Sequence, residues 1–166
     1  MKIAIDFDDT IVCTKEKVRE FLNRYHIDSF KDVIEKEQFY HRYIDEMTKE
    51  LKLKKHAKEV LQQLALDHEL YIVTARSDYY SKNCKKIVTD YIKEKELPIK
   101  EIFFDCYEEG KANKCLELGI DLFIDDHVNN CLAVASKGIK VILFEAKQKG
   151  LSSIKNWKQI RKYIKE

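Results

Sequence analysis

The sequence predicts an α/β fold: a Rossmann-like, doubly wound parallel sheet with helices on both faces. Three observations predict this class. Short apolar runs rich in Ile, Val and Phe recur along the chain, and amphipathic helical patterns separate them. Strands that alternate with helices favour a parallel sheet. The third observation is that the first run, KIAID, ends beside three acids, Asp6, Asp8 and Asp9, at the edge where such sheets bind ligands.

Five runs are predicted to be strands because each is short, apolar and enclosed by polar or helical segments. They are residues 2–6, 70–74, 101–105, 121–125 and 139–144. Apolar residues at three- and four-residue steps predict helices between and after these runs, and Gly119 is expected to end one of them. These helices cover residues 84–92, 112–118, 128–135 and 154–160.

The stretch between the first two strands has a different pattern. Residues 14–68 contain no strand candidate, but three amphipathic faces begin near Val18, Tyr40 and Ala57. The third face is expected to lead back into the sheet. The other two exceed what one crossover needs. We therefore expect an α/β core formed by residues 1–13 and 69–166, with a helical cap inserted at 14–68.

Composition limits the classes of function. The chain has 166 residues, 36% of them charged, and a formal net charge of +2, which gives no reason to expect a nucleic-acid polymer or a membrane as partner. The N-terminus runs directly into acids rather than a signal peptide, which favours a cytoplasmic location. None of the 5 cysteines forms a C-x-x-C pair, so buried thiols are expected instead of disulfides or a zinc site. The oligomeric state stays open, with a homodimer as one alternative.

Acids also follow the fourth predicted strand, at Asp125 and Asp126. Because parallel strands deliver their carboxyl ends to one edge, these acids should meet Asp6 and Asp8 there. Clustered carboxylates repel one another, and a hard divalent cation such as Mg²⁺, which prefers oxygen ligands, relieves that repulsion. A single acid pair could instead serve as helix N-caps, but two pairs on separate strands predict a magnesium site.

Four motifs, in this order, resemble those of the haloacid dehalogenase-like (HAD) phosphohydrolase superfamily. They are D-x-D-x-T (Asp6, Asp8, Thr10), a strand-ending Thr (Thr74), a helix Lys (Lys111, with Lys114 as competitor) and an acidic pair (Asp125, Asp126). The chain is most similar to the small 5'-nucleotidases of the 5'(3')-deoxyribonucleotidase type, which share a compact helical cap and an IDD fourth motif. It departs from the superfamily at Asp9, where Gly is usual.

The resemblance implies a mechanism. Asp6 would be the nucleophile that forms an aspartyl-phosphate, and Asp8 would be the general acid and base. Lys111 would screen the charge of Asp6, and Thr74 would hydrogen-bond a phosphate oxygen. Substrate-binding positions carried over with these motifs are Thr10, Ala75 and Arg76.

The resemblance also implies the ligands of the metal. Mg²⁺ would be held by Asp6, the backbone carbonyl of Asp8, and Asp126, with assistance from Asp125. His127 is a tempting ligand, but beside hard oxygen ligands it is better interpreted as a helix-start residue. Asn130 is a candidate for orienting a metal-bound water.

Two further sets of residues carry alternatives. Arg76 either reaches a second anionic group or is an exposed loop arginine. The cap aromatics Phe39, Tyr40 and Tyr43 either stack on a base or sugar, or form core contacts. The cap is expected to close over the site and set specificity.

The predicted function is a Mg²⁺-dependent phosphomonoester hydrolase, a 5'-nucleotidase for nucleoside or deoxynucleoside monophosphates. The partner is thus a small phosphorylated metabolite. A phosphatase of sugar or other small phosphomonoesters is the alternative within enzymes. A non-catalytic binding protein on the same fold is the alternative outside them.

Overall fold

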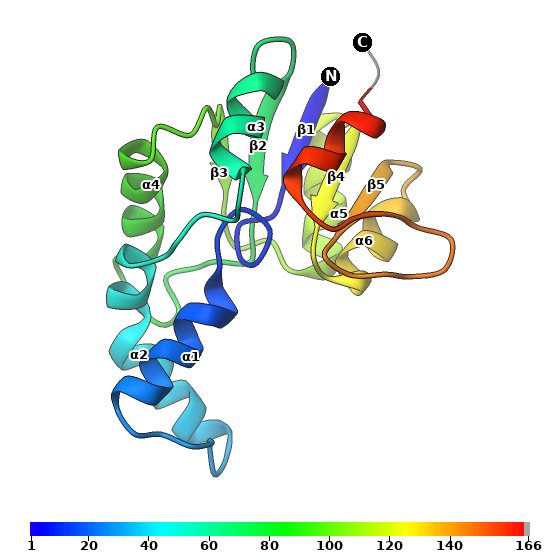
Figure 1. The fold of residues 1–166 in the computed structure, drawn as a ribbon. Coiled ribbons are helices and arrows are strands. Elements are labelled where there is room, and N and C mark those ends of the chain that lie inside the picture. The colour runs from blue at the N-terminus through cyan, green and yellow to red at the C-terminus, as the bar shows by residue number, and fades with distance from the viewer. Residues whose placement is uncertain (165–166) are drawn as a thin grey trace.

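The computed structural model describes residues 1–164, and its centre is a sheet of parallel strands in the order β3-β2-β1-β4-β5-β6 (Figure 1). The strands are β1 (Lys2–Ile5), β2 (Glu69–Val73), β3 (Glu101–Phe103), β4 (Leu122–Asp125), β5 (Lys140–Phe144) and β6 (Ser152–Ile154). All neighbouring strands pair in parallel. The predicted class, a doubly wound α/β sheet, is confirmed.

The C-terminal segment differs from the prediction of one helix over residues 154–160. Ile154 belongs to β6, which pairs with β5, and a separate 3₁₀ helix, η1 (Trp157–Lys162), follows. Ile154, Trp157 and Ile160 are all buried, but Ile154 lies in β6, and only the step of three residues from Trp157 to Ile160 falls within the 3₁₀ helix, where it matches one turn. The strand escaped prediction because it is only three residues long and its first residue is exposed.

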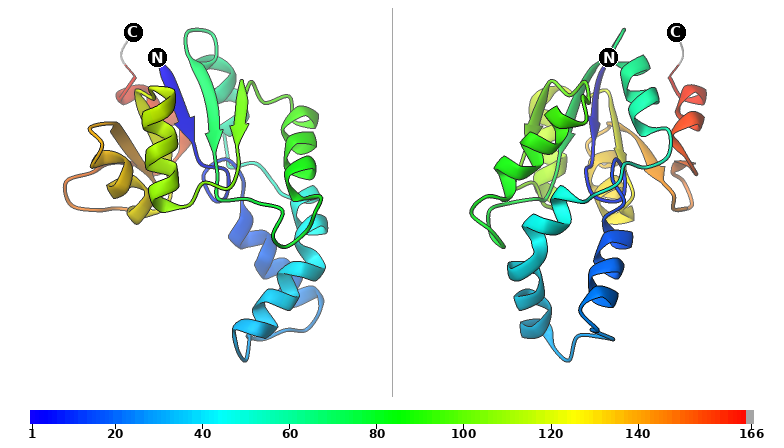
Figure 2. Two further views of the ribbon diagram at one scale, coloured as in Figure 1. Left: turned by 180° about the vertical axis from the view of Figure 1, so that it is seen from behind. Right: turned by 60° about the vertical axis from the view of Figure 1, so that its left-hand side comes forward.

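Alternate residues of the central strands face opposite layers of helices. In β1, Ile3 and Ile5 pack against α3 (Ala57–Leu64), α4 (Cys84–Glu94) and η1. Ala4, between them, belongs to the core beneath α5 (Glu108–Leu118) and α6 (Val128–Ala135). Figure 2 shows helices on both sides of the sheet. A sheet covered on both faces accounts for strands that read as continuous apolar runs.

Helices α1 (Thr14–Arg24) and α2 (Val33–Lys49), here called the helical pair, extend beyond the carboxyl ends of the strands (Figures 1 and 2). The pair has a hydrophobic cluster of its own, formed by Phe21, Phe39, Ile44 and Met47. Helix α2 also packs along α4. The helical pair lies within the residues predicted as a cap, and the division of the chain into cap and core stays a prediction.

The cysteines are dispersed through the fold. All five carry free thiols, and Cys84, Cys106, Cys115 and Cys131 are buried, whereas Cys13 is half-buried. Within residues 1–164, no helix combines the length and the apolar character that a membrane crossing requires.

Candidate active site

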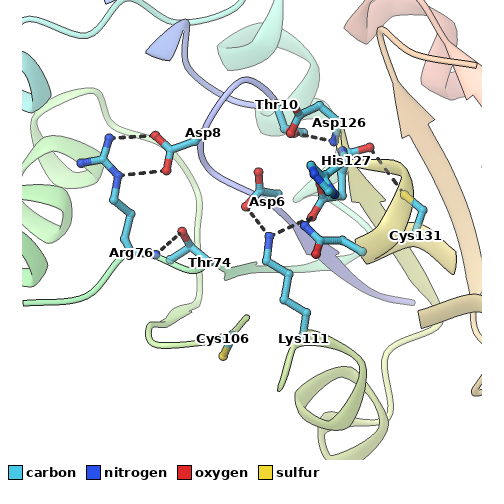
Figure 3. A network of polar contacts seen from close by, with 12 residues as sticks. Asp6, Asp8, Thr10, Thr74, Arg76, Cys106, Lys111, Asp126, His127 and Cys131 are labelled. Carbon is cyan, nitrogen blue, oxygen red and sulfur yellow. Dashed lines mark hydrogen bonds and ion pairs between the residues drawn. The ribbon is translucent and has the colours of Figure 1, made fainter. Parts of the chain in front are cut away.

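Asp6 and Lys111 form the centre of a polar cluster at the carboxyl edge of the sheet. Asp6 follows β1, and its backbone N–H continues the sheet by donating to the carbonyl of Ile124 at 2.9 Å. Lys111 extends from α5, where its Nζ lies 2.6 Å from Asp6 Oδ1 and 2.8 Å from Asp125 Oδ2 (Figure 3). Lys111 is 2% exposed and Asp6 is 6% exposed. One ammonium group is therefore shared by two carboxylates away from water.

The electrostatics of this cluster follow from its burial. Burial raises the pKa of Asp6 well above its usual value, and the charges of Asp125 and Asp8 add to that rise while Lys111 opposes it. Burial acts to lower the pKa of Lys111, but the adjacent Asp6 and Asp125 outweigh it and raise the pKa. Lys111 is thus firmly charged, and the site holds more negative than positive charge.

Three side chains could hold a metal ion together. Asp6, Asp125 and Asp126 each offer a carboxylate oxygen, and these three oxygens lie within 4.8 Å of one another. All the donors are hard oxygens, which suits Mg²⁺. Burial, together with the charges of Asp125 and Asp9, raises the pKa of Asp126. A divalent cation would offset this excess of negative charge, so the residues present fit the ion.

Asp125 and Asp126 have different surroundings. Asp125 is fully buried, and its oxygens accept hydrogen bonds from Lys111, the backbone of His127 at 2.7 Å and Asn130 Nδ2 at 3.0 Å. Asp126 retains some exposure and accepts one long hydrogen bond, 3.3 Å, from the hydroxyl of Thr10. The geometry therefore favours Asp126 as a direct ligand and gives Asp125 a role in fixing Lys111.

Asp8 lies on the other side of Asp6, where Arg76 holds it (Figure 3). Arg76 Nε donates to Asp8 Oδ2 at 2.9 Å and Nη2 donates to Oδ1 at 2.7 Å. The Thr14 hydroxyl donates to the same Oδ1 at 2.5 Å. Burial acts to raise the pKa of Asp8, but Arg76 and Thr14 outweigh it and hold the pKa below its usual value. Asp8 is thus stabilised as the carboxylate.

Arg76 also contacts the helical pair, because its Nη1 donates to Thr48 Oγ1 of α2 at 2.9 Å. Only 8% of the Arg76 side chain is exposed, so the alternative of an exposed loop arginine is wrong. Burial acts to lower its pKa, but Asp8 outweighs this and raises it. The bidentate contact with Asp8 was not predicted, because no spacing in the sequence reports it.

The two predicted threonines differ in position. Thr74 follows β2 and is fully buried, and its Oγ1 accepts the backbone N–H of Arg76 at 3.1 Å, which orients the hydroxyl at the sheet edge. Thr10 is also fully buried, and its Oγ1 accepts the backbone N–H of Asp126 at 3.1 Å. Thr10 therefore braces Asp126 instead of facing an open site.

The structure also places three other residues discussed from the sequence: Lys114, His127 and Asp9. Lys114 pairs with Glu117 at 3.1 Å, away from Asp6, so the geometry favours Lys111 as the motif lysine. His127 is exposed and precedes the first residue of α6, as expected of a helix-start residue. Asp9 has a φ of 58°, a left-handed conformation that Asp tolerates better than most residues, and its side chain accepts the backbone N–H of Lys15 at 3.0 Å. This is why the loop accommodates Asp where Gly is usual.

A cavity of about 530 Å³ adjoins Asp8 and Arg76, and Ala75 is among its lining residues. Of the cap aromatics proposed from the sequence, only Tyr40 lines it. Phe39 is buried in the core of the helical pair, and Tyr43 stacks on Tyr25 with ring centroids 4.3 Å apart. Three further tyrosines that were not predicted, Tyr79, Tyr80 and Tyr107, also line the cavity. They lie in the loops after β2 and β3, and the only signal in the sequence is that these loops follow predicted strands, which does not mark which rings face the cavity.

Solved structures define the class of fold. The chain is similar to the HAD-hydrolase YfnB from Bacillus subtilis, solved with bound magnesium (TM-score 0.67, 14% identity, 98% of this chain and 97% of that one). It is also similar to a phosphoserine phosphatase solved as a phospho-aspartyl intermediate analogue (TM-score 0.64, 17% identity, 99% and 98%). A HAD hydrolase of Geobacter sulfurreducens matches comparably (TM-score 0.66, 11% identity, 98% and 98%). The chain therefore has the HAD-like hydrolase fold.

One curated protein with a similar sequence is named as a nucleotidase. A nucleotidase of Clostridium acetobutylicum is 28% identical over 87% of this chain and 80% of that protein. No protein-family model matches the chain. The resemblance inferred from the motifs, to the HAD superfamily and its nucleotidases, is confirmed, and it supports a phosphatase- or nucleotidase-like enzyme.

Proposed function

We propose that this chain is a Mg²⁺-dependent phosphomonoester hydrolase that forms an aspartyl-phosphate on Asp6 and acts on nucleoside or deoxynucleoside monophosphates. One observation carries the proposal. The Asp6 carboxylate lies at the carboxyl edge of the sheet, 2.6 Å from the buried Lys111 ammonium and within a cluster that includes Asp125 and Asp126. A nucleophile for phosphoryl transfer needs positive charge around it, because the transferring group carries charge on its outer oxygens.

The metal would be held by the side chains of Asp6 and Asp126 and by the backbone carbonyl of Asp8, with Asp125 assisting. When bound, Mg²⁺ supplies positive charge that offsets the repulsion between carboxylate and phosphate. Lys111, which extends from α5 to Asp6, contributes a further positive charge. Thr74, oriented by the backbone of Arg76, donates its hydroxyl to a phosphate oxygen.

The reaction then has two steps. In the first, a carboxylate oxygen of Asp6 bonds to phosphorus, the bond from phosphorus to the leaving oxygen breaks, and Asp8 gives that oxygen a proton. In the second, a water oxygen bonds to phosphorus, the acyl-phosphate bond breaks, and Asp8 accepts the proton of the water. Inorganic phosphate leaves, and both aspartates return to their starting state.

The contact between Arg76 and Asp8 suits the second step directly, because it holds Asp8 in the anionic form that accepts a proton. The first step needs Asp8 protonated. The negative charge of a bound phosphate acts in that direction, because an adjacent like charge raises the pKa of a carboxyl group. Substrate binding and the proton on Asp8 are therefore coupled.

Two observations support a nucleotide as substrate. The curated relative is named as a nucleotidase. The cavity beside Asp8 is about 530 Å³, within the usual range for small-molecule sites, and is lined by tyrosines. The substrate is accordingly a small phosphorylated metabolite. The cytoplasmic location and the homodimer stay predictions.

A screen of purified protein against phosphomonoesters tests the proposal. We expect turnover of nucleoside monophosphates with Mg²⁺, reversible loss of activity in EDTA, and no restoration by Ca²⁺. The longer bonds of Ca²⁺, roughly 2.3 to 2.6 Å, and its six to eight ligands would engage both oxygens of Asp6. Turnover of sugar phosphates alone would favour the sugar-phosphatase alternative. Undiminished activity in EDTA would remove the metal from the mechanism.

Trapping separates the enzyme from a non-catalytic protein on this fold. Beryllofluoride mimics a phosphoryl group, so with Mg²⁺ it should form an adduct on Asp6 that fluorine NMR detects. Asp6→Asn is the matched control, because the amide keeps the shape and loses the nucleophile. Absence of an adduct on the parent protein would contradict the proposed mechanism.

A further inference from the structure

The cavity beside Asp8 is positioned to receive the leaving group of the substrate. It adjoins Asp8 and Arg76, on the side of Asp6 opposite Asp126 (Figure 3). Asp8 is the residue that would pass a proton to the leaving oxygen. Whatever that oxygen carries must therefore extend from Asp8 into the space next to it, and the walls of this cavity decide which leaving groups fit.

Four tyrosines line the cavity, and three of them lie outside the helical pair. Tyr79 and Tyr80 lie in the segment between β2 and α4, and Tyr107 directly precedes α5. Tyr40 is the lining tyrosine that comes from α2. Strands β2 and β3 are neighbours in the sheet, so their following loops approach the same cavity from one side.

The four tyrosines differ in how their rings are used. Tyr40 and Tyr80 pack on each other, with ring centroids 5.2 Å apart, and Tyr80 also packs edge-on against His41. These two rings are held by protein contacts. Tyr79 also packs edge-on against Tyr80, with ring centroids 5.0 Å apart, but Tyr79 and Tyr107 are each 59% exposed although both belong to the cavity wall. Large aromatic surface left in water at a cavity is typical of a binding site.

The hydroxyl groups of these exposed tyrosines are restrained. Tyr79 Oη lies 3.1 Å from both carboxylate oxygens of Glu37, to which it donates. Tyr107 Oη lies 3.5 Å from Ser77 Oγ, which belongs to the Tyr79 loop. A ring fixed through its hydroxyl loses little further entropy when a ligand stacks on its face. The Tyr79 ring is therefore restrained in place to contact a flat partner, whereas the Tyr107 ring is held more loosely and contributes its exposed face.

We propose that Tyr79 and Tyr107 are specificity-determining residues that select a substrate whose leaving group carries a planar aromatic base, by stacking on that base. This inference rests on the proposed function and adds that recognition lies on the loops after β2 and β3. It differs from the expectation that the helical cap sets specificity. Aromatic stacking on a base is tolerant of base identity, because every base has a π-face. The tyrosine pair accordingly selects for the presence of a base more than for its type.

The experiment compares two substrates that differ only in the base: the best nucleoside 5'-monophosphate of the screen and the matching pentose 5-phosphate. Tyr79→Leu and Tyr107→Leu should each lower kcat/KM for the nucleotide about tenfold, chiefly through KM, and leave kcat/KM for the pentose phosphate unchanged. Tyr107→Phe should lower kcat/KM for the nucleotide far less than Tyr107→Leu, because the ring remains and only the 3.5 Å contact of the hydroxyl with Ser77 is lost. Tyr25→Leu, at the far end of α1, is the control tyrosine and should change neither substrate.

Two results would overturn the inference. One is that neither leucine variant lowers kcat/KM for the nucleotide, and the other is that kcat/KM falls equally for the nucleotide and the pentose phosphate. Thermal melts of each variant identify misfolding, and Tyr107→Phe then decides the role of the Tyr107 ring. If the parent hydrolyses no phosphomonoester at all, the proposed function fails on its own. Binding of the free nucleoside, measured by NMR, still decides the inference: weaker binding by the leucine variants supports it, and unchanged binding overturns it.

Discussion

Asp6 and Asp8 are two residues apart, yet the fold places their carboxylates in opposite electrostatic surroundings. Asp6 shares one ammonium with Asp125 and lies near Asp126, and burial raises its pKa. Asp8 has a guanidinium of its own, and Arg76 lowers its pKa despite burial. One side of the site is short of positive charge and the other side is fully neutralised.

The difference supports the two chemical roles proposed for the acids of one short motif. Environments that push the pKa values of two acids apart are the usual way for enzymes to divide acid–base tasks. The acid-rich side of Asp6 suits a divalent cation and a phosphate. The side of Asp8 keeps a carboxylate ready to move a proton. The contrast comes from what β2 and α5 bring to each acid, because the two aspartates themselves are identical.

The largest expected effect separates the two acids by rate. Asp6→Asn should lower kcat/KM by on the order of 10⁴-fold or more, as expected when a nucleophile is lost. Asp8→Asn should lower it by on the order of 10²- to 10⁴-fold, as expected for a general acid–base. Steady-state kinetics with an alkyl phosphate, at saturating Mg²⁺, measures both. Comparable activity of Asp6→Asn and the parent would break the comparison.

A smaller effect is expected from the lysine on the Asp6 side. Lys111→Met should lower kcat by about 10²- to 10³-fold, because a buried positive charge next to the reacting group is lost. Mg²⁺ affinity should be kept, because the carboxylates remain. Lys114→Met is the matched control one turn along α5 and should change kcat less than about twofold, since its partner is the surface residue Glu117. Kinetics measured across a Mg²⁺ titration gives both kcat and the apparent affinity for Mg²⁺. A larger loss of kcat in Lys114→Met than in Lys111→Met would refute the assignment of Lys111 as the motif lysine.

The smallest expected effect is on the stability of the folded protein without metal. It tests most directly whether Asp6 and Asp8 have opposite electrostatic surroundings. The lowered pKa of Asp8 means that its ionised form stabilises the folded protein, and this stability is present above the ordinary pKa and lost as pH falls through the folded pKa. The raised pKa of Asp6 has the opposite sign, so its ionised form costs stability above its ordinary pKa.

At pH 7 in EDTA, Asp8→Asn should therefore lower the free energy of unfolding by about 1 to 3 kcal/mol, as expected when the buried donors of Arg76 lose a charged acceptor. Asp6→Asn should leave it unchanged or raise it. Urea unfolding curves measure both. If both variants shift the midpoint in the same direction, the two acids do not differ as described.

Much of the site was predictable because its residues follow strands in a fixed order. Asp6, Thr74 and Asp125 were placed at one edge by the apolar runs that precede them, and the structure brings them to that edge. The lysine was ambiguous in sequence, since Lys111 and Lys114 differ by about one helical turn. Packing of α5 against the sheet decides between them, and this depends on contacts across more than one hundred residues.

Other features were beyond the sequence for a physical reason. The pairing of Arg76 with Asp8 joins two loops through side chains alone, so it has no periodicity to detect. The short strand β6 depends on pairing with β5 more than on its own apolar character. The exposed tyrosines of the cavity lie in loops, where neither a helical nor a strand pattern marks which ring faces a ligand.

The contact of Arg76 with Thr48 has a consequence for how this protein could be re-engineered. A single guanidinium joins the loop after β2, the first acidic loop and helix α2. Exchange of the helical pair for one from a related protein would therefore not be a neutral transplant. A graft without a hydroxyl at position 48 would leave a buried N–H of Arg76 without its acceptor and release one of the constraints on Asp8. In a chimera, Thr48 has to be kept together with Arg76, although the two residues lie in different elements, α2 and the loop after β2.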